Sequence, residues 1–302
     1  MIRWQVGYSC FCAGRLQEAL DVLAEVADRS DGDSSPNIMG FSPWIMSLMI
    51  SSRAAAWRGD LDRARALDER TIELAREGNR AEELGWGLAT GADIALFDGE
   101  HRNARAPDLD RAVLEALEIA NRLGSHFSRT TTLDNLGQAH LVAGRWTEAI
   151  RAFEEALDLM RREGTFTEDE SLILAYLARA HLEAGDTSRA RALVDDAIKV
   201  AACAERPHQE AFAHLTGARI DLTTDGATGR ERIEASLARG RELVEQTGAH
   251  GLSPQIREVE ARLAMRSGDH EASGRTLREA LALYEEIHAL GHAARLRAEL
   301  GV

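Results

Sequence analysis

Cysteine, proline and aromatic residues are scarce in this chain of 302 residues, and each scarcity excludes a class of protein. Cys10, Cys12 and Cys203 are odd in number and lack the spacing of a disulfide framework, so we expect a reducing, cytoplasmic setting. Five prolines and 5% aromatic residues, beside many Ala, Leu, Glu and Arg, favour helices over strands. The apolar runs are shorter than the ~20 residues of a membrane span.

Basic residues are also in deficit, with 36 Lys and Arg against 50 Asp and Glu, a formal net charge of -14. Nucleic acids and anionic membrane surfaces are bound by clustered basic residues, and the sequence has no such cluster. We therefore predict neither a nucleic-acid partner nor a membrane partner. The 44% hydrophobic content is enough to bury a core, which argues against disorder.

Catalytic and cofactor motifs are absent from the sequence. It contains neither the Gly-x4-Gly-Lys-Ser/Thr loop that holds phosphates nor the Gly-x-Ser-x-Gly motif of hydrolases. The glycine-rich stretch from Gly85 to Gly91 follows no strand, so we expect it to pack inside a helix. His288 and His292, four residues apart, would share a helix face, but no third ligand lies nearby. We predict no cofactor, no metal and no enzyme activity.

An internal repeat is the main feature that the sequence does contain. A glycine between two helix-like segments recurs seven times, at spacings of 45, 40, 45, 41, 41 and 42 residues, as Gly14, Gly59, Gly99, Gly144, Gly185, Gly226 and Gly268. Seven residues before it, six of the seven units have a small residue, namely Gly7, Ser52, Ala92, Gly137, Ala178 and Ala261, with Arg219 as the exception. Small side chains at a fixed offset indicate two antiparallel helices that approach closely beside a tight turn.

This repeat predicts one all-α domain over residues 1–302, a solenoid of about seven antiparallel helix pairs. The expected units are 1–29, 43–77, 80–124, 126–163, 168–204, 207–247 and 253–290, followed by a capping helix over 291–300. Ser42 before Pro43, together with Asp60 and Asp186, has the residue type of a helix N-cap. Thr167 with Glu170 has the spacing of a capping box.

The fourth unit resembles the tetratricopeptide repeat most clearly. Its matching residues are Leu136-Gly137, Trp146, Ala149, Phe153 and Ala156, with His140 where the family usually has Tyr. The period of 40–45 residues is longer than the family's usual ~34, and this variant is similar to the C-terminal repeat regions of large bacterial signalling ATPases, ATPase-linked nucleotide cyclases and maltose-regulator-type activators. The chain opens inside a predicted helix without a cap, so we expect a fragment or a truncated relative of such a protein.

The resemblance implies a right-handed superhelix whose first helices line a concave groove for a protein or peptide partner. It places ten residues in that groove: Arg53, Trp86, Asp93, Asp134, Asn135, Gln138, Tyr176, Arg179, Glu258 and Arg262. Polar residues on a wet inner face would give the same pattern without any binding role.

Two functional hypotheses therefore stay open. The first is a non-catalytic scaffold that binds a protein or peptide in the regulatory region of a bacterial signalling or transcription system. The second is a metabolite sensor with a pocket around Trp86, Asp93 and Asn135. The apolar N-terminal end, with Ile2, Trp4 and Val6, predicts either a lost neighbouring repeat or a self-association surface.

Overall fold

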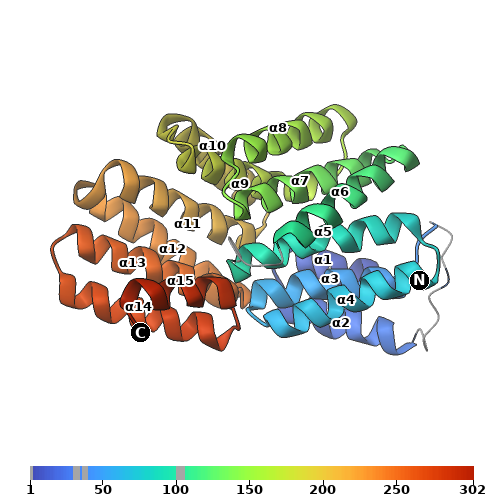
Figure 1. The fold of residues 1–302 in the computed structure, drawn as a ribbon, viewed down its shortest axis with the longest axis horizontal. Coiled ribbons are helices and arrows are strands. Elements are labelled where there is room, and N and C mark those ends of the chain that lie inside the picture. Colours follow the sequence, from blue (N-terminus) through green and yellow to red (C-terminus); the bar gives the residue numbers. More distant parts are fainter. Residues whose placement is uncertain (1–2, 30–34, 36–39, 100–105) are drawn as a thin grey trace.

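The computed structural model describes residues 3–29, 35, 40–99 and 106–302, and in this part of the chain all regular structure is helical (Figure 1). Its α-helices are α1 (Arg3–Cys12), α2 (Leu16–Arg29), α3 (Pro43–Arg58), α4 (Leu61–Glu77), α5 (Ala81–Asp98), α6 (Ala106–Leu123), α7 (His126–Val142), α8 (Trp146–Glu163), α9 (Glu170–Glu183), α10 (Thr187–Cys203), α11 (Pro207–Thr224), α12 (Arg230–Thr247), α13 (Ser253–Arg266), α14 (His270–Glu286) and α15 (Leu290–Leu300). Three short 3₁₀ helices, η1 (Thr167–Asp169), η2 (Gly226–Gly229) and η3 (His250–Leu252), lie in the connections.

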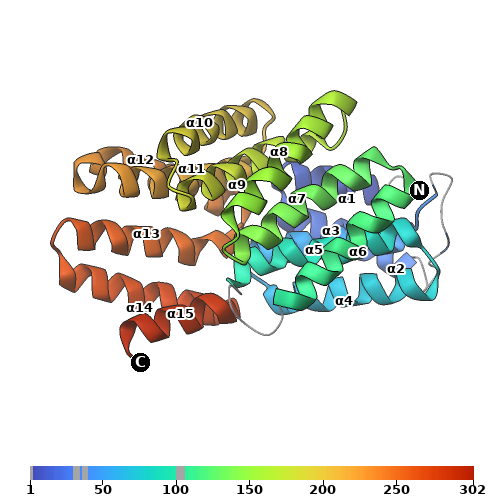
Figure 2. The same ribbon diagram turned by 45° about the horizontal axis from the view of Figure 1, so that its top comes forward.

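The helices form consecutive antiparallel pairs, as the glycine repeat predicts. Each first helix packs against its own second helix, and it also packs against the first helix of the next pair, from α1 and α3 through to α11 and α13. Figure 2 shows the pairs following one another around a curved path. This is the all-α architecture of a tetratricopeptide-like solenoid, with the first helices on its inner side.

Local capping chemistry sets several helix starts where the sequence places them. The Ser42 hydroxyl accepts a hydrogen bond from the Ile45 N–H at 3.4 Å, and Asp60 accepts one from the Arg63 N–H at 3.2 Å. Gly59 ends α3 in the left-handed region at φ 85°, which a side chain would strain. The capping-box prediction at Thr167 is wrong, because Thr167 belongs to η1 and α9 begins at Glu170 without a side-chain cap.

Gly137 shows why the small position recurs within the pairs. A Cβ atom added there would lie 2.5 Å from the Phe153 ring of α8, well inside van der Waals contact. The absence of a side chain therefore lets α7 and α8 pack with the Phe153 ring directly against the α7 backbone. Unit six departs from this pattern as its sequence does, since η2 lengthens its turn and Arg219 extends to the Gln255 amide oxygen at 2.9 Å.

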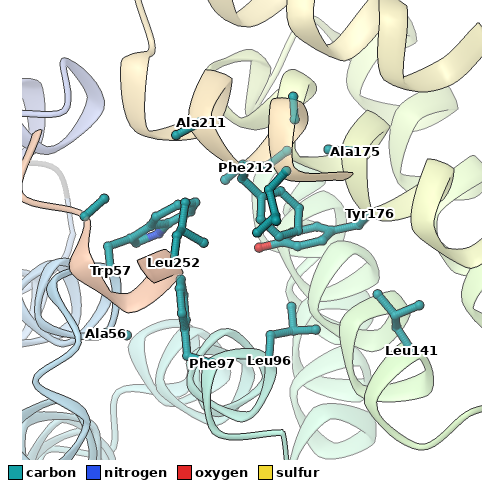
Figure 3. Packing of buried hydrophobic residues seen from close by; sticks show 14 of the residues in the cluster. Ala56, Trp57, Leu96, Phe97, Leu141, Ala175, Tyr176, Ala211, Phe212 and Leu252 are labelled. Carbon is teal, nitrogen blue, oxygen red and sulfur yellow. The ribbon is translucent and has the colours of Figure 1, made fainter. Parts of the chain in front are cut away.

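The two ends of the solenoid meet, so that the N-terminal pairs contact the C-terminal ones. Trp57 at the end of α3 packs edge-on against Phe97, His208 and Phe212, with ring centroids 5.2, 4.9 and 6.3 Å apart. Figure 3 shows Trp57, Phe97 and Leu252 gathered beside Phe212. We call this contact, made by Phe11, Trp57, Phe97, His208 and Phe212, the seam.

Backbone also approaches backbone at this point, since a Cβ on Gly251 would lie 2.7 Å from the Ala56 carbonyl oxygen. The seam holds together segments more than 100 residues apart in the sequence.

The N-terminal end differs from the exposed apolar patch that the sequence predicts. Trp4 is buried and packs against Phe41, whereas Val6 is exposed and Ile2 lies outside the described residues. The prediction that Trp4 contributes to an open self-association surface is therefore wrong. Within the described residues, no helix combines the length and the apolar character needed to span a bilayer.

Candidate functional site

A cavity of about 400 Å³ opens on the inner side of the N-terminal pairs. Its walls come from the first helices of four consecutive pairs and from two connecting segments, and they consist of Trp4 and Tyr8 of α1, Met46, Met49, Ile50 and Arg53 of α3, Glu82, Trp86, Thr90 and Asp93 of α5, Phe127, Thr131 and Asn135 of α7, and Phe41, Phe166 and Glu168. On each helix the lining residues recur every three or four positions, which is the spacing that aligns side chains along one face.

Five aromatic rings form a continuous series along the cavity, and we call them the aromatic series. The rings follow in the order Trp4, Phe41, Trp86, Phe127 and Phe166, with successive centroids 5.1, 6.1, 5.8 and 5.7 Å apart. Each ring meets the next at an angle between 68° and 88°, the edge-to-face geometry that aromatic pairs prefer.

One buried cation, Arg53, lies at the polar end of the cavity. Its Nε atom is 3.0 Å from Asp93 Oδ2, and its Nη2 atom donates to Asp169 Oδ2 at 2.7 Å. Asp169 also accepts a hydrogen bond from Gln209 Nε2 at 2.9 Å, which connects α3 through η1 to α11. The Arg53 guanidinium also lies over the Phe11 ring, 5.1 Å from the ring centroid. Its edge therefore pairs with two carboxyl groups, while its face contacts an aromatic ring.

Further carboxyl groups lie close behind this cation. Burial raises the pKa of Asp134 well above its usual range, and the charges of Asp93 and Asp169 raise it further. Burial also raises the pKa of Asp93, although the neighbouring Arg53 opposes that rise. Gln138 donates to Asp134 Oδ2 at 3.0 Å, while the other oxygen of Asp134 is buried without a partner. This end of the solenoid therefore concentrates acidic groups around a single arginine.

The structure brings four of the ten predicted groove residues, Arg53, Trp86, Asp93 and Asn135, into this one cavity. Asp134 and Gln138 are buried behind its wall.

Tyr176 does not face a groove, because its buried ring packs between Phe153 and Phe212 at centroid distances of 5.9 and 4.9 Å. The prediction that Tyr176 lines the groove is wrong, because Phe153 and Phe212 cover its side chain.

The remaining three predicted residues lie towards the C-terminal end. Glu258 and Arg262 on α13 contact each other at 3.4 Å and are joined by Arg295 and Glu299 of α15. Arg179 is half-buried on α9, where burial and the charge of Arg219 together lower its pKa to about 10. None of these three residues lines the cavity.

The histidine pair is also corrected by the structure. A turn separates His288 from His292, because α14 ends at Glu286 and His288 has φ 56°. His292 is buried and stacks on Tyr284 at 4.6 Å, whereas His288 pairs with Asp62. The described residues contain no group of three or more His, Cys, Asp or Glu side chains placed to hold a metal ion.

Several cavity residues were not among the predicted ones. Glu82, Phe127 and Thr131 stand four or eight residues from a predicted position on the same helix, so the helical spacing could have found them. Glu168 lies in η1, and Phe166 lies directly before that helix with φ 57°. No periodic signal in the sequence fixes the direction of side chains in such a turn.

Comparison with known proteins agrees with the fold. Residues 111–162 and 128–202 match the model of the tetratricopeptide repeat family. No curated protein sequence matches the chain. Together with the helix-pair architecture, the match shows a tetratricopeptide-like helical repeat protein.

Solved structures give the same fold at low sequence identity. The Rap conjugation gene regulator of the plasmid pLS20, in complex with the Phr* peptide, has a TM-score of 0.69 at 16% identity, over 95% of this chain and 74% of that one. A Rap protein complexed with Competence and Sporulation Factor has a TM-score of 0.58 at 11% identity, over 99% of this chain and 96% of that one.

A signal transduction ATPase with a tetratricopeptide repeat sensor, from Pyrococcus horikoshii, has a TM-score of 0.47 at 16% identity, over 94% of this chain and 41% of that one. A TM-score below 0.5 does not establish a shared fold, so the relation to signalling ATPases stays a prediction.

Proposed function

We propose that this chain is a non-catalytic regulatory repeat protein that binds a peptide segment in the cavity of its inner face. The observation that carries the proposal is the cavity itself, an apolar hollow built by the first helices of four consecutive pairs. In solenoid proteins the extended inner surface is where partners bind. As in the sequence-based hypothesis, the setting is a bacterial signalling or transcription system.

The polar groups of the cavity suit a peptide backbone. The Asn135 amide is oriented by a hydrogen bond from its Nδ2 atom to the Ala89 carbonyl oxygen at 3.0 Å. Asn135 lines the cavity, and its side-chain oxygen is an acceptor that can take a hydrogen bond from a backbone N–H. The aromatic series supplies the apolar surface that an anchoring side chain needs. A structural neighbour that is a gene regulator was solved with a peptide, which supports the same mode.

A bound peptide can act on the rest of the molecule through Arg53. This residue lines the cavity and also joins α3 to Asp169 of η1, and Asp169 in turn joins Gln209 of α11. A ligand that contacts Arg53 therefore perturbs a polar link between the N-terminal and C-terminal helices. In this proposal the output is a change in how the two ends meet at the seam.

Selection from a random peptide library displayed on phage tests the proposal, with the wild-type chain and two tryptophan variants as bait. Trp86→Ala removes the central ring of the aromatic series, whereas Trp44→Ala removes a half-buried tryptophan that does not line the cavity. We expect peptides enriched by the wild type to bind Trp44→Ala equally and Trp86→Ala at least about tenfold more weakly. Enrichment of no peptide, or equal loss in both variants, contradicts the proposal.

A metabolite sensor is the second candidate, favoured by the size of the cavity. A volume of about 400 Å³ falls within the ~300–1,000 Å³ range of small-molecule sites. A panel of metabolites screened by thermal shift tests it, since a ligand at about 100 times its Kd adds ~2.7 kcal/mol to the free energy of unfolding. A shift that survives Trp44→Ala and disappears in Trp86→Ala would favour the sensor over the peptide receptor.

A further inference from the structure

We propose that the cavity selects a positively charged group on an apolar body, meaning an alkylammonium or guanidinium group. This inference rests on the proposed function, because it names the chemistry of what that cavity binds. Such a group can come from a basic side chain of a peptide or from a free organic amine. The argument uses the aromatic walls, the charge balance of the lining and the engagement of Arg53.

The aromatic walls favour a cation. The aromatic series and Tyr8 place six aromatic side chains around one cavity. Because successive rings of the series are nearly perpendicular, their π faces point in different directions around the hollow. A ring face attracts a cation within about 6 Å, and several faces around one space form the cage that proteins use for ammonium groups.

The charges of the lining have the complementary sign. Three carboxyl side chains, Glu82, Asp93 and Glu168, line the cavity against the single basic residue Arg53. Glu82 accepts a hydrogen bond from the Ser128 hydroxyl at 2.6 Å, and Glu168 accepts one from the Tyr8 hydroxyl. Neither glutamate has an ion pair within the described part of the chain. Two carboxylates therefore face the same cavity, and the groups that donate hydrogen bonds to them are neutral hydroxyls.

Arg53 does not offset this excess. It is held between Asp93 and Asp169, so its positive charge is already shared by two carboxyl groups. Its side chain is only 12% exposed, which leaves little of the guanidinium for an anionic ligand. A neutral ligand would displace water from Glu82 and Glu168 without replacing the lost hydration, whereas a cation would pair with both.

The decisive comparison uses ligands that differ in charge and share their shape. For the peptide source we would use pools of blocked pentapeptides with one position fixed as arginine, citrulline or glutamate, since citrulline is a neutral analogue of arginine. For the free-amine source we would use phenethylammonium against 2-phenylethanol. Binding is measured by affinity-selection mass spectrometry for the pools and by tryptophan fluorescence for the two small molecules.

The variant that tests the charge is the double change Glu82→Gln and Glu168→Gln, which keeps size and hydrogen-bonding capacity. Its matched control is Glu115→Gln with Glu118→Gln, the same change of net charge on the exposed face of α6, away from the cavity. We expect the arginine pool or phenethylammonium to bind at least about tenfold more tightly than its neutral partner. The double cavity variant should abolish that preference, and the α6 control should keep it. Circular dichroism melting checks that each variant is folded.

The remaining outcomes separate this inference from the proposed function. If the citrulline or glutamate pool binds best and Trp86→Ala abolishes that binding, the cavity is a peptide site and the charge inference is wrong. If the arginine preference is the same in the cavity variant and in the α6 control, the two glutamates do not carry it and the inference also fails. If no pool and no amine binds, both the inference and the proposed peptide site are contradicted.

Discussion

The two ends of the inner face use equivalent repeat positions for opposite purposes. At the N-terminal end, Arg53 of α3 and Asp93 of α5 border a hollow lined by aromatic rings. At the C-terminal end, Glu258 and Arg262 of α13 form ion pairs with side chains of α15, and neither residue lines the cavity. A repeat position therefore specifies which way a residue points, while the neighbouring element decides whether that residue borders a cavity or packs against the protein itself.

The two ends also differ in how many hydrogen-bond partners their carboxyl groups have. Glu258 accepts hydrogen bonds from Arg295 at 2.9 and 2.7 Å and from the Tyr284 hydroxyl at 3.2 Å. Asp134 at the other end has only Gln138 for one oxygen and no partner for the second. Glu258 is thus paired on both carboxyl oxygens, whereas Asp134 at the N-terminal end is a buried acidic group with one unpaired oxygen, which a stability-optimised core would avoid.

Removing Tyr284 should cause the largest loss of stability, because its ring is fully buried under α15 and stacks on His292. We expect Tyr284→Ala to lower the free energy of unfolding by about 3–5 kcal/mol, as for other large aromatic deletions. The counterpart Phe127→Ala, in the cavity wall and 37% exposed, should cost about 1 kcal/mol. Urea unfolding of both variants measures the difference, and equal losses would show that the two ends are packed alike.

Glu258→Gln should cause the next largest effect, and its size should depend on pH. Burial alone would raise the pKa of Glu258, but hydrogen bonds from Arg295 and the charges of Arg295 and Arg219 hold it at about 2. Because this value lies below that of the unfolded chain, the unfolded chain binds more protons as the pH falls from about 5 towards 2. The carboxylate therefore stabilises the fold above pH 5, and this contribution disappears over that acid window.

We expect Glu258→Gln to lower the free energy of unfolding by about 2 kcal/mol at pH 7 and to change it little at pH 2.5. Urea titrations of wild type and variant at both values measure this. His292 adds a second slope to wild type and variant, since burial lowers its pKa to about 3 against the opposing charge of Glu258, and its protonation opposes folding below about pH 6.5. A loss at pH 2.5 as large as that at pH 7 would show that Glu258 acts through packing and not through its charge.

The sequence was sufficient to predict the helix pairs, because the glycine turns and the small positions are local consequences of two helices packing closely. Gly137 against Phe153 is the clearest example of that contact. The same helical period pointed Arg53, Trp86, Asp93 and Asn135 inward, and those four residues meet in the cavity. Their role in binding stays a prediction.

What could not be predicted depends on contacts between distant or non-periodic segments. Phe41, Phe166 and Glu168 complete the cavity from connections between helices, where no helical period fixes the direction of a side chain. The covering of Glu258 depends on α15 folding back over α13, and the seam brings Trp57 against His208. Neither contact leaves a pattern in the sequence around the residues that make it.

A pair of glycine changes tests whether the close packing of α7 on α8 behind the cavity is rigid. Gly137→Ala places a methyl group 2.5 Å from Phe153, so we expect a loss of about 1–3 kcal/mol from overpacking. Gly217→Ala in α11 is the matched control, because its new Cβ would meet no atom closer than 3.8 Å. Alanine should stabilise that helix position by about 0.5–1 kcal/mol. Thermal unfolding separates the two, and a neutral Gly137→Ala would mean that α7 and α8 can move apart.

The smallest effect is expected from Asp134→Asn behind the cavity wall, and like Gly217→Ala this change should stabilise the fold. Because burial raises the pKa of Asp134, the folded chain holds a proton that the unfolded chain releases above about pH 4. Stability is therefore lost as the pH rises through this range, and the permanently neutral asparagine avoids that loss. We expect Asp134→Asn to melt at a higher temperature than wild type at pH 8 and at nearly the same temperature at pH 3.5. If the variant is instead less stable at pH 8, Asp134 is ionised in the folded protein, and the acidic end of the cavity attracts cations more strongly than Glu82 and Glu168 alone would.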